Sequence, residues 1–99
     1  MELSEKVYRI VRQIPEGRVL TYGDVARMTG IRSPRVVGIF LHRNPDPAKT
    51  PCHRVVNHIG KVSSGYAFGG AEVQKKKLID EGVPFVKDRV NLRVSLWIR

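Results

Sequence analysis

The first third of the chain carries apolar residues at the spacing of an α-helix. The run predicts a helix because its apolar positions recur at i, i+3, i+4 and i+7, as Val7, Ile10, Val11 and Ile14. Ser4 stands where an N-cap is expected, and Pro15-Glu16-Gly17 follows the run. We therefore expect a first helix that Ser4 caps and that this Pro-Glu-Gly segment ends.

Two shorter helices are predicted next, with a tight turn between them. Thr21-x-x-Asp24 has the form of a capping box that opens the first, and Gly30 stands at its C′ position. Ser33 as N-cap and Pro34 at the first helical position open the second. Its inward-facing apolar positions are Val37, Phe40 and Leu41. Two short helices in this arrangement, the first ending in Gly, are typical of a helix-turn-helix.

Short apolar steps alternate with turn residues in the second half. Val55-Val56 and Lys61-Val62 flank Asn57-His58-Ile59-Gly60, which predicts a small hairpin. A Gly-rich loop over residues 63–70 leads into a helix from about Ala71 to Glu81, which Gly82 ends.

The C-terminal segment predicts a second hairpin, from residues 83–86 and 90–92 around the turn Lys87-Asp88-Arg89. Leu96 and Trp97 are expected to pack the C-terminus onto the body. The chain has no internal repeat, long linker or low-complexity tract. The pattern therefore predicts one α+β domain over residues 1–99, a small winged helix-turn-helix domain.

Charge adds a class of partner to this picture. The chain has 18 Lys and Arg against 9 Asp and Glu, which gives a net charge of +9 and a pI near 10.3. Each phosphate that a basic side chain neutralises releases condensed counterions, so this imbalance favours a nucleic-acid partner over a protein that is simply basic.

The compartment follows from what the sequence does not contain. No apolar run is long enough to cross a bilayer, and the N-terminus, Met1-Glu2-Leu3-Ser4-Glu5-Lys6, lacks the pattern of a signal peptide. A single cysteine cannot form an internal disulfide, which fits a reducing environment. We expect a cytoplasmic, nucleoid-associated protein, or a nuclear one in a eukaryote, with no membrane association.

The candidate chemistry lies in Pro51-Cys52-His53-Arg54-Val55, where the single cysteine stands beside a histidine. Thiolate chemistry depends on neighbouring charge and access, although most free cysteines are buried and inert. Because Cys52 and His53 are adjacent and nothing else completes a ligand set, we expect no metal and no cofactor.

Several motifs then occur in order along the chain. They are Thr21-Tyr22-Gly23-Asp24-Val25-Ala26, Ser33-Pro34-Arg35-Val36-Val37-Gly38, Arg43-Asn44-Pro45, Pro51-Cys52-His53-Arg54-Val55-Val56 and Leu78-Ile79-Asp80-Glu81-Gly82. From about residue 4 to 97 the series resembles the C-terminal, active-site domain of the O6-alkylguanine-DNA alkyltransferases (methylated-DNA–protein-cysteine methyltransferases). The resemblance implies that domain's fold, without the N-terminal domain of full alkyltransferases.

This family has two branches, and the chain resembles both. Alkyltransferase-like proteins are single domains that bind alkylated guanine without repairing it, and they replace the cysteine, often with tryptophan. The length resembles this branch, as does the ending: Gly69-Gly70-Ala71-Glu72-x-Gln74, then Arg89-Val90-Asn91-Leu92 before Trp97. The cysteine itself resembles the alkyltransferases.

For the reaction, the resemblance implies roles for four residues. Cys52 is the nucleophile that takes the alkyl group from guanine O6, His53 is the base that acts through a water, and Glu81 orients the histidine. Asn44 matches the hinge asparagine that links the recognition helix to the active-site turn. The product is a thioether that nothing in the chain reverses, so the protein is expected to act once.

For DNA binding, the resemblance implies minor-groove contact by the second helix of the helix-turn-helix. Arg35 is the finger that fills the gap left by the extruded nucleotide, and Gly38 allows close approach to the groove. Tyr22 helps rotate the nucleotide out, since a thiol in a pocket cannot reach a base inside a duplex.

Two further segments contact the base in the resembled family. Val55 offers its backbone carbonyl to the guanine amino group. Tyr66 and the Ala67 N–H match the loop that closes over the flipped base, with Phe68 inserted into the family's Tyr-x-Gly-Gly spacing.

Other polar residues are expected to be structural or solvated. Arg54 is either an ion-pair partner or a phosphate contact, and Lys75-Lys76-Lys77 is a solvated helix face. His42 and His58 are taken as surface residues.

Three functions stay open on this basis. The first is single-turnover repair of O6-alkylguanine in double-stranded DNA, by a monomer that works as a methyltransferase. The second is a non-enzymatic protein that flags alkylguanine for nucleotide excision repair, with excision-repair proteins as partners. The third is a winged-helix regulator, for which Pro34, Val36 and Gly38 offer little base-edge readout.

Overall fold

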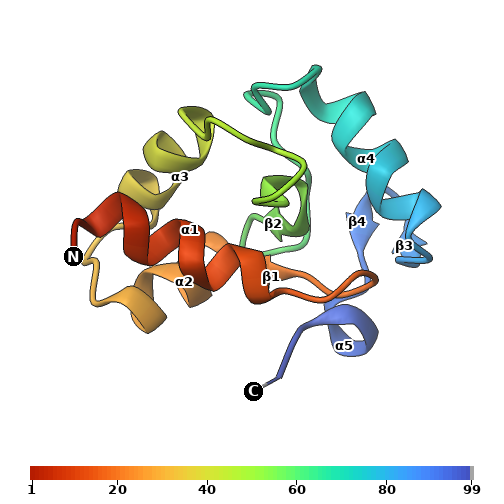
Figure 1. Ribbon diagram of the computed structural model, residues 1–99. Helices are drawn as coiled ribbons and strands as arrows, with labels where there is room; N and C mark the ends of the chain where they lie inside the picture. Colours follow the sequence, from red (N-terminus) through yellow and green to blue (C-terminus); the bar gives the residue numbers. More distant parts are fainter. Residues whose placement is uncertain (99) are drawn as a thin grey trace.

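Three helices form the N-terminal half of the molecule. The computed structural model describes residues 1–98, and its first three helices are α1 (Leu3–Gln13), α2 (Tyr22–Thr29) and α3 (Pro34–His42). They lie together on one side of the molecule (Figure 1). Their inward faces build one core, in which Val7, Val11, Val25 and Val37 are completely buried. Burial of these apolar faces, more than helix propensity, holds such short helices together.

The helix-turn-helix prediction is confirmed, and local capping explains it. The Thr21 hydroxyl accepts a hydrogen bond from the Asp24 N–H at 3.0 Å, and the Asp24 carboxylate accepts one from the Thr21 N–H at 3.0 Å. Gly30 ends α2 in the left-handed region with φ of +75°, a conformation that glycine adopts without strain. Ser33 caps α3 through the Arg35 N–H at 3.2 Å.

The prediction that Ser4 caps the first helix is wrong. Helix α1 begins one residue earlier, at Leu3, and its N-cap Glu2 makes no side-chain capping bond. Packing of Val7 and Val11 against the other helices therefore sets the position of α1, because no cap competes with it.

A pair of parallel two-residue strands joins the two halves. Strand β1 (Leu20–Thr21) pairs with β2 (Val55–Val56), with Leu20 opposite Val55. The predicted hairpin between Val55-Val56 and residues 61–62 is therefore wrong. The intervening turn does close, through the Asn57 N–H and the Lys61 carbonyl at 3.0 Å. Val55 and Val56 are both fully buried, so this strand lies inside the molecule.

Helix α4 and a small hairpin form the other half of the molecule (Figure 1). Helix α4 (Gly70–Asp80) starts and ends one residue before its predicted bounds, and Gly82 follows with φ of +88°. Strands β3 (Phe85–Val86) and β4 (Arg89–Val90) form the predicted antiparallel hairpin, shorter than expected because α5 (Leu92–Ser95) begins at Leu92.

The C-terminal segment returns to the centre of the fold. The Val19 N–H donates to the Ser95 carbonyl at 2.9 Å, and the Trp97 N–H donates to the Val19 carbonyl at 2.8 Å. Trp97 packs against the N-terminal core, as predicted. A second core of Val19, Val56, Leu78, Val83 and Val90 lies beneath α4 and the hairpin. The strand pair β1–β2 thus contributes to both cores.

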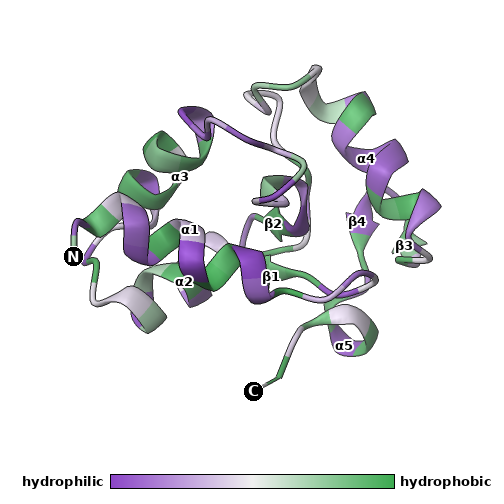
Figure 2. Ribbon diagram, viewed as in Figure 1, coloured by the Kyte–Doolittle hydropathy of each residue, from purple (hydrophilic) through white to green (hydrophobic). Residues whose placement is uncertain are grey.

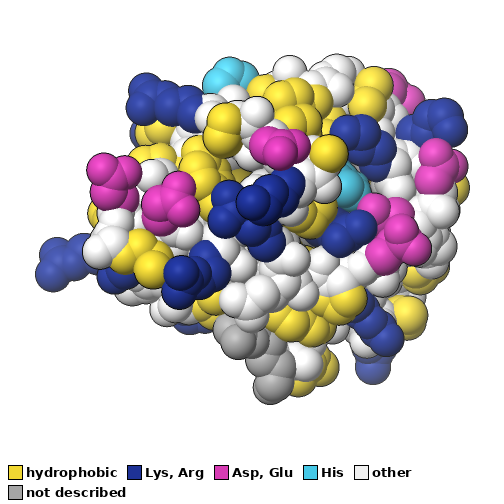
Figure 3. All heavy atoms as spheres, in the orientation of Figure 1, with side chains coloured by type: hydrophobic (Ala, Val, Ile, Leu, Met, Phe, Trp, Pro, Cys, Tyr) yellow, Lys and Arg dark blue, Asp and Glu magenta, His cyan; other side chains and the backbone are white. Residues whose placement is uncertain are grey.

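The surface of this fold carries charged side chains together with exposed apolar ones. In Figure 2, hydrophilic and hydrophobic residues alternate along α1 and α4. The space-filling view shows Lys and Arg side chains spread over the visible face (Figure 3). Within residues 1–98, no helix has the length and apolar character needed to span a membrane.

Candidate active site and DNA interface

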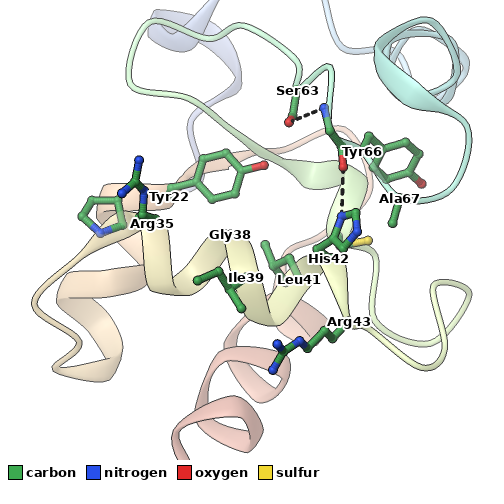
Figure 4. Close-up of a pocket in the computed structure, with 13 residues that line it drawn as sticks. Tyr22, Arg35, Gly38, Ile39, Leu41, His42, Arg43, Ser63, Tyr66 and Ala67 are labelled. Carbon is green, nitrogen blue, oxygen red and sulfur yellow. Dashed lines mark hydrogen bonds between the residues drawn. The ribbon is translucent and has the colours of Figure 1, made fainter.

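A cavity of about 560 Å³ lies between the helix-turn-helix and the loop before α4. Six residues singled out in the sequence line it: Tyr22, Arg35, Gly38, Cys52, Tyr66 and Ala67. In Figure 4 the Tyr22 ring points along α3 toward residues 63–67, whereas Arg43 points away from them. The fold therefore brings the cysteine and the helix-turn-helix to the same hollow.

Cys52 begins a one-turn 3-10 helix, Cys52–Arg54, directly before β2. Its side chain is buried, with 5% of the residue exposed, yet it borders the cavity. Its N–H donates to the Thr50 carbonyl at 2.8 Å, and the Asn44 side-chain amide donates to the same carbonyl at 2.7 Å. Asn44 therefore connects the end of α3 to the turn that carries the thiol.

The thiol is protonated in this environment at neutral pH. Burial raises the pKa of Cys52 above its ordinary value, and this effect outweighs the opposing hydrogen bond from Asn44, the local backbone N–H and the charge of Lys77. Any reaction at this sulfur therefore needs a base.

His53, Arg54 and Glu81 form an ion network next to the thiol. The His53 Nε2 lies 2.7 Å from Glu81 Oε2, and Arg54 donates to both carboxylate oxygens, from Nε at 2.9 Å and from Nη2 at 2.8 Å. A third donor, Arg54 Nη1, reaches the Ile14 carbonyl at 2.8 Å. Arg54 is thus the structural ion-pair partner that was one of its two predicted roles.

Charge states within the network follow from its geometry. Burial alone raises the pKa of Glu81, but the hydrogen bonds from Arg54 and His53 outweigh it and hold the pKa below its usual value. Burial lowers the pKa of His53, more than the Glu81 carboxylate raises it. A neutral imidazole beside an ionised carboxylate carries its proton on Nε2, which leaves Nδ1 with a free lone pair.

The loop over residues 63–67 forms the second wall of the cavity. Two hydrogen bonds fold it, from the Tyr66 N–H to the Ser63 carbonyl at 3.1 Å and from the Gly65 N–H to the Ser63 hydroxyl at 3.1 Å. The His42 Nδ1 lies 3.2 Å from the Gly65 carbonyl (Figure 4). His42 is exposed, as predicted, and this contact ties the end of α3 to the loop.

Two residues of α3 stand out on the wall of the cavity that the helix-turn-helix forms, Gly38 by its small size and Arg35 by its exposure. A methyl group added at Gly38 would lie 3.9 Å from the Tyr22 ring, which is ordinary contact. Arg35 is exposed at the start of α3, on the rim of the cavity. Burial raises the pKa of Tyr22, so its hydroxyl stays a neutral donor at neutral pH.

Val55 does not border the cavity with the other predicted residues. Its side chain is fully buried, and its carbonyl accepts a hydrogen bond from Gln74 Nε2 at 3.0 Å. The same Gln74 amide donates to the His53 carbonyl at 3.1 Å and its oxygen accepts from the Ser63 N–H at 2.9 Å. Gln74 thereby links the cysteine turn, β2 and the cavity loop.

Sequence reasoning did not identify Gln74 or Lys77 as part of this site. The Lys77 ammonium donates to the Tyr66 hydroxyl at 2.8 Å, so this member of the lysine run is not merely a solvated residue. The signal in the sequence is spacing: Gln74, Lys77 and Glu81 fall at i, i+3 and i+7, on one face of a helix.

The described part of the chain does not bring together the ligands of a metal ion. Residues 1–98 hold no group of three or more His, Cys, Asp and Glu side chains placed to bind a metal ion.

Comparisons with known proteins agree on one family. Residues 2–83 match the model of the 6-O-methylguanine DNA methyltransferase, DNA binding domain. A methylated-DNA–protein-cysteine methyltransferase of Methanocaldococcus jannaschii is 44% identical over 92% of this chain and 48% of its own length. Alkyltransferase-like protein 1 of Schizosaccharomyces pombe is 37% identical over 97% of this chain and 94% of its own length.

Solved structures give the same result. The crystal structure of S. pombe Atl1 in complex with damaged DNA containing O6-carboxymethylguanine superposes with a TM-score of 0.86 at 33% identity, covering 98% of this chain and 95% of that one. The chain spans about half the length of the methyltransferase from M. jannaschii, 48%. The match over residues 2–83 and the near full-length relative show that the chain belongs to the 6-O-methylguanine DNA methyltransferase family, whose DNA-binding domain it shares.

Proposed function

We propose that the protein binds double-stranded DNA containing O6-alkylguanine, turns the damaged nucleotide out through the minor groove and transfers the alkyl group to Cys52. One observation carries this proposal: the thiol opens onto the same cavity as the helix-turn-helix residues Tyr22, Arg35 and Gly38. The helix-turn-helix and the nucleophile therefore border the same cavity. A base that is flipped out of the duplex into this cavity would reach the thiol.

Binding relies on charge and on the exposed start of α3. The net charge of +9 attracts the phosphate backbone. Arg35 fills the space that the extruded nucleotide leaves in the base stack, while Gly38 lets the helix approach the minor groove closely. The flipped guanine enters the cavity between Tyr22 and the loop that carries Tyr66 and Ala67.

In the reaction, the Cys52 proton passes through a water to Nδ1 of His53, whose Nε2–H is held by Glu81. The thiolate sulfur then attacks the alkyl carbon, so that an S–C bond forms as the bond from that carbon to guanine O6 breaks. The departing guanine takes a proton from the Tyr22 hydroxyl, which regains one from solvent. The thioether has no route back to a thiol, so each molecule reacts once.

A second candidate function is lesion binding without transfer, as a mark for nucleotide excision repair and its proteins. The observation that favours it is coverage: the structure of S. pombe Atl1 covers 98% of this chain, whereas that of Mycobacterium tuberculosis OGT in complex with DNA covers 83%. The retained Cys52 favours transfer, and we rank repair first for that reason.

Supporting features of the proposal concern assembly and location. We propose that the protein acts as a monomer, built as a single domain over residues 1–99. It needs no metal or cofactor, and it works in the cytoplasm or, in a eukaryote, the nucleus, where the DNA lies. Sedimentation with and without a lesion duplex measures the assembly state; a dimer in both contradicts this part.

The deciding test is the intact mass of the protein after incubation with a duplex that contains one O6-methylguanine. Transfer adds one methylene, which peptide mapping assigns to Cys52. A matched Cys52→Ser variant keeps its mass and still binds the duplex, since a hydroxyl replaces the thiol at the same size. Lesion binding by the unmodified chain with no change in mass rejects transfer in favour of the second candidate.

A further inference from the structure

Lys77 lies between two cavities, one lined by His53 and Glu81 and the other lined by Cys52. It lies on α4, half-buried, and it lines the cavity of about 470 Å³ that also holds His53 and Glu81. Its ammonium donates to the Tyr66 hydroxyl at 2.8 Å, and the Tyr66 ring lines the other cavity, with Cys52. In Figure 4 that hydroxyl points away from Tyr22.

The neighbouring lysines show that this placement is specific. Lys76, one residue away, is 76% exposed and pairs with Asp80 at 3.0 Å on the solvent side of the helix. Lys75 faces the exposed Asp88. The ammonium of Lys77 points inward and donates to the hydroxyl of the buried Tyr66. Solvent therefore screens the charge of Lys77 less than the charge of Lys76.

We propose that Lys77 is a positioning residue of the site: it holds Tyr66 and the cavity loop in place, and its positive charge favours the thiolate form of Cys52. This inference rests on Cys52 being the reacting atom in the proposed function. It gives a role to a residue other than Cys52, His53 and Glu81. Lys77 acts on the site from α4 and not from the turn that carries the cysteine.

Other ionisable groups surround the thiol on each packed element. Tyr8 on α1 and Tyr22 on α2 are close enough to be influenced by the charge of Cys52. His42 and Arg43 border its cavity from the end of α3, and His53 and Arg54 follow it in its own turn. Arg54 is neutralised by Glu81, with which it makes two hydrogen bonds. Against the burial that raises the pKa of Cys52, the charge of Lys77 acts to lower it, and the same charge lowers the pKa of His53.

The test is a titration of the thiolate by its ultraviolet absorbance, with Cys52→Ser as the blank; the chain has one cysteine, so the difference signal comes from Cys52 alone. We expect Lys77→Met to raise the midpoint by roughly half a pH unit, below the range for an opposite charge in direct contact with the titrating group. Lys77→Arg keeps the wild-type midpoint, and the matched control Lys76→Met, which removes an exposed charge from the same helix, leaves it unchanged.

A second pair of variants tests the link through Tyr66. Tyr66→Phe removes the acceptor and frees the ammonium, so we expect a smaller rise than with Lys77→Met. The double variant rises no further than Lys77→Met alone, since the two residues act as one unit. Thermal unfolding of each variant verifies that it is folded.

Three results would overturn the inference: equal midpoints for Lys77→Met and wild type, absence of ionisation in both, or equal shifts for Lys77→Met and Lys76→Met. No DNA enters the titration. A chain that takes up no methyl but shows the Lys77 shift therefore loses the proposed function and keeps only the effect of Lys77 on the Cys52 thiol. A chain that takes up methyl but shows no Lys77 shift keeps the proposed function and loses the role of Lys77.

Discussion

Cys52 and His53 are neighbours in the chain, yet they line different cavities, and the two sides are built differently. The Cys52 side is bordered largely by apolar side chains and by two helices that begin with local caps. The His53 side is bordered by charged residues from distant segments, including Arg12, Lys49 and Asp80. The first side is a mainly apolar hollow, and the second side holds a network of opposite charges.

This difference has an energetic consequence. On the apolar side the walls are joined by hydrogen bonds such as that between His42 and the Gly65 carbonyl, so we expect a change in one residue to alter fit while the fold persists. On the polar side the ion network is connected, since Glu81 serves His53 and Arg54 together. Removing one member leaves a largely buried charge without its partner, which costs more than the missing contact alone.

The largest expected effect comes from breaking the network with Glu81→Gln. Because Arg54 keeps its charge and loses its carboxylate, we expect a loss of about 2 kcal/mol in the free energy of unfolding, below the range for fully buried pairs. With His53 no longer oriented, methyl transfer slows by about 100-fold. Urea unfolding and single-turnover rates measure the two effects. The control Asp80→Asn, next in the chain and 62% exposed, changes neither.

Removing the arginine on the rim tests the other side. Arg35→Ala is expected to weaken lesion binding by about tenfold. The variant loses both the side chain that fills the gap in the base stack and a cation that attracts the DNA. Its stability stays within about 0.5 kcal/mol of wild type, as for other exposed positions. Fluorescence anisotropy with lesion and undamaged duplexes measures binding. Arg32→Ala, exposed and outside the cavity lining, serves as the control; equal losses for both variants would remove the finger assignment.

A smaller effect separates fit from stability on the same wall. Gly38→Ala places a methyl group in ordinary contact with Tyr22, so the fold accepts it and gains about 0.5 kcal/mol from helix propensity. Lesion binding falls about threefold, since the helix approaches the groove less closely. Gly23→Ala gives the matched comparison, because it gains the same propensity on α2 away from the cavity lining. Equal binding by the two variants contradicts close approach at Gly38.

The smallest effect is the dependence of stability on pH. The pKa of His53 is lowered in the fold from 6.5, so its contribution to stability is complete above 6.5 and is lost as the pH falls below it. The pKa of Glu81 is lowered from 4.5, so a second loss begins below 4.5. Urea midpoints across this range detect both losses, and Glu81→Gln lacks the lower one. A midpoint that is constant on crossing 6.5 disagrees with a buried neutral His53.

Local signals predicted the helix-turn-helix well, because caps act within one turn of the chain. The Thr21–Asp24 box, Gly30 and the Ser33-Pro34 start all lie where the sequence indicated. Local signals failed at Ser4, where packing of α1 overrides a possible cap. They failed again at Val55-Val56. This strand pairs with Leu20-Thr21, 35 residues earlier in the chain, and not with the segment that follows it.

The candidate site divides in the same way. Its residue types and their order, Cys52-His53-Arg54 with Glu81 before Gly82, are a property of the sequence. The sharing of one carboxylate between His53 and Arg54 spans 28 and 27 residues, and no local rule reports it. The sequence placed Gln74 in a family-like motif and Lys77 on a solvated helix face, and only the fold provides their partners in the site.

By itself the sequence determined the basic charge, the capped helices and the presence of one thiol beside one histidine, because these depend on composition and on contacts within a few residues. Only the tertiary structure decided that Cys52 and His53 line separate cavities, and that Lys77 turns inward while Lys76 faces solvent. Those outcomes depend on how α3, α4 and the central strand pair close around the cysteine turn. The burial of a shared core sets that closure, and the core collects residues from the whole length of the chain.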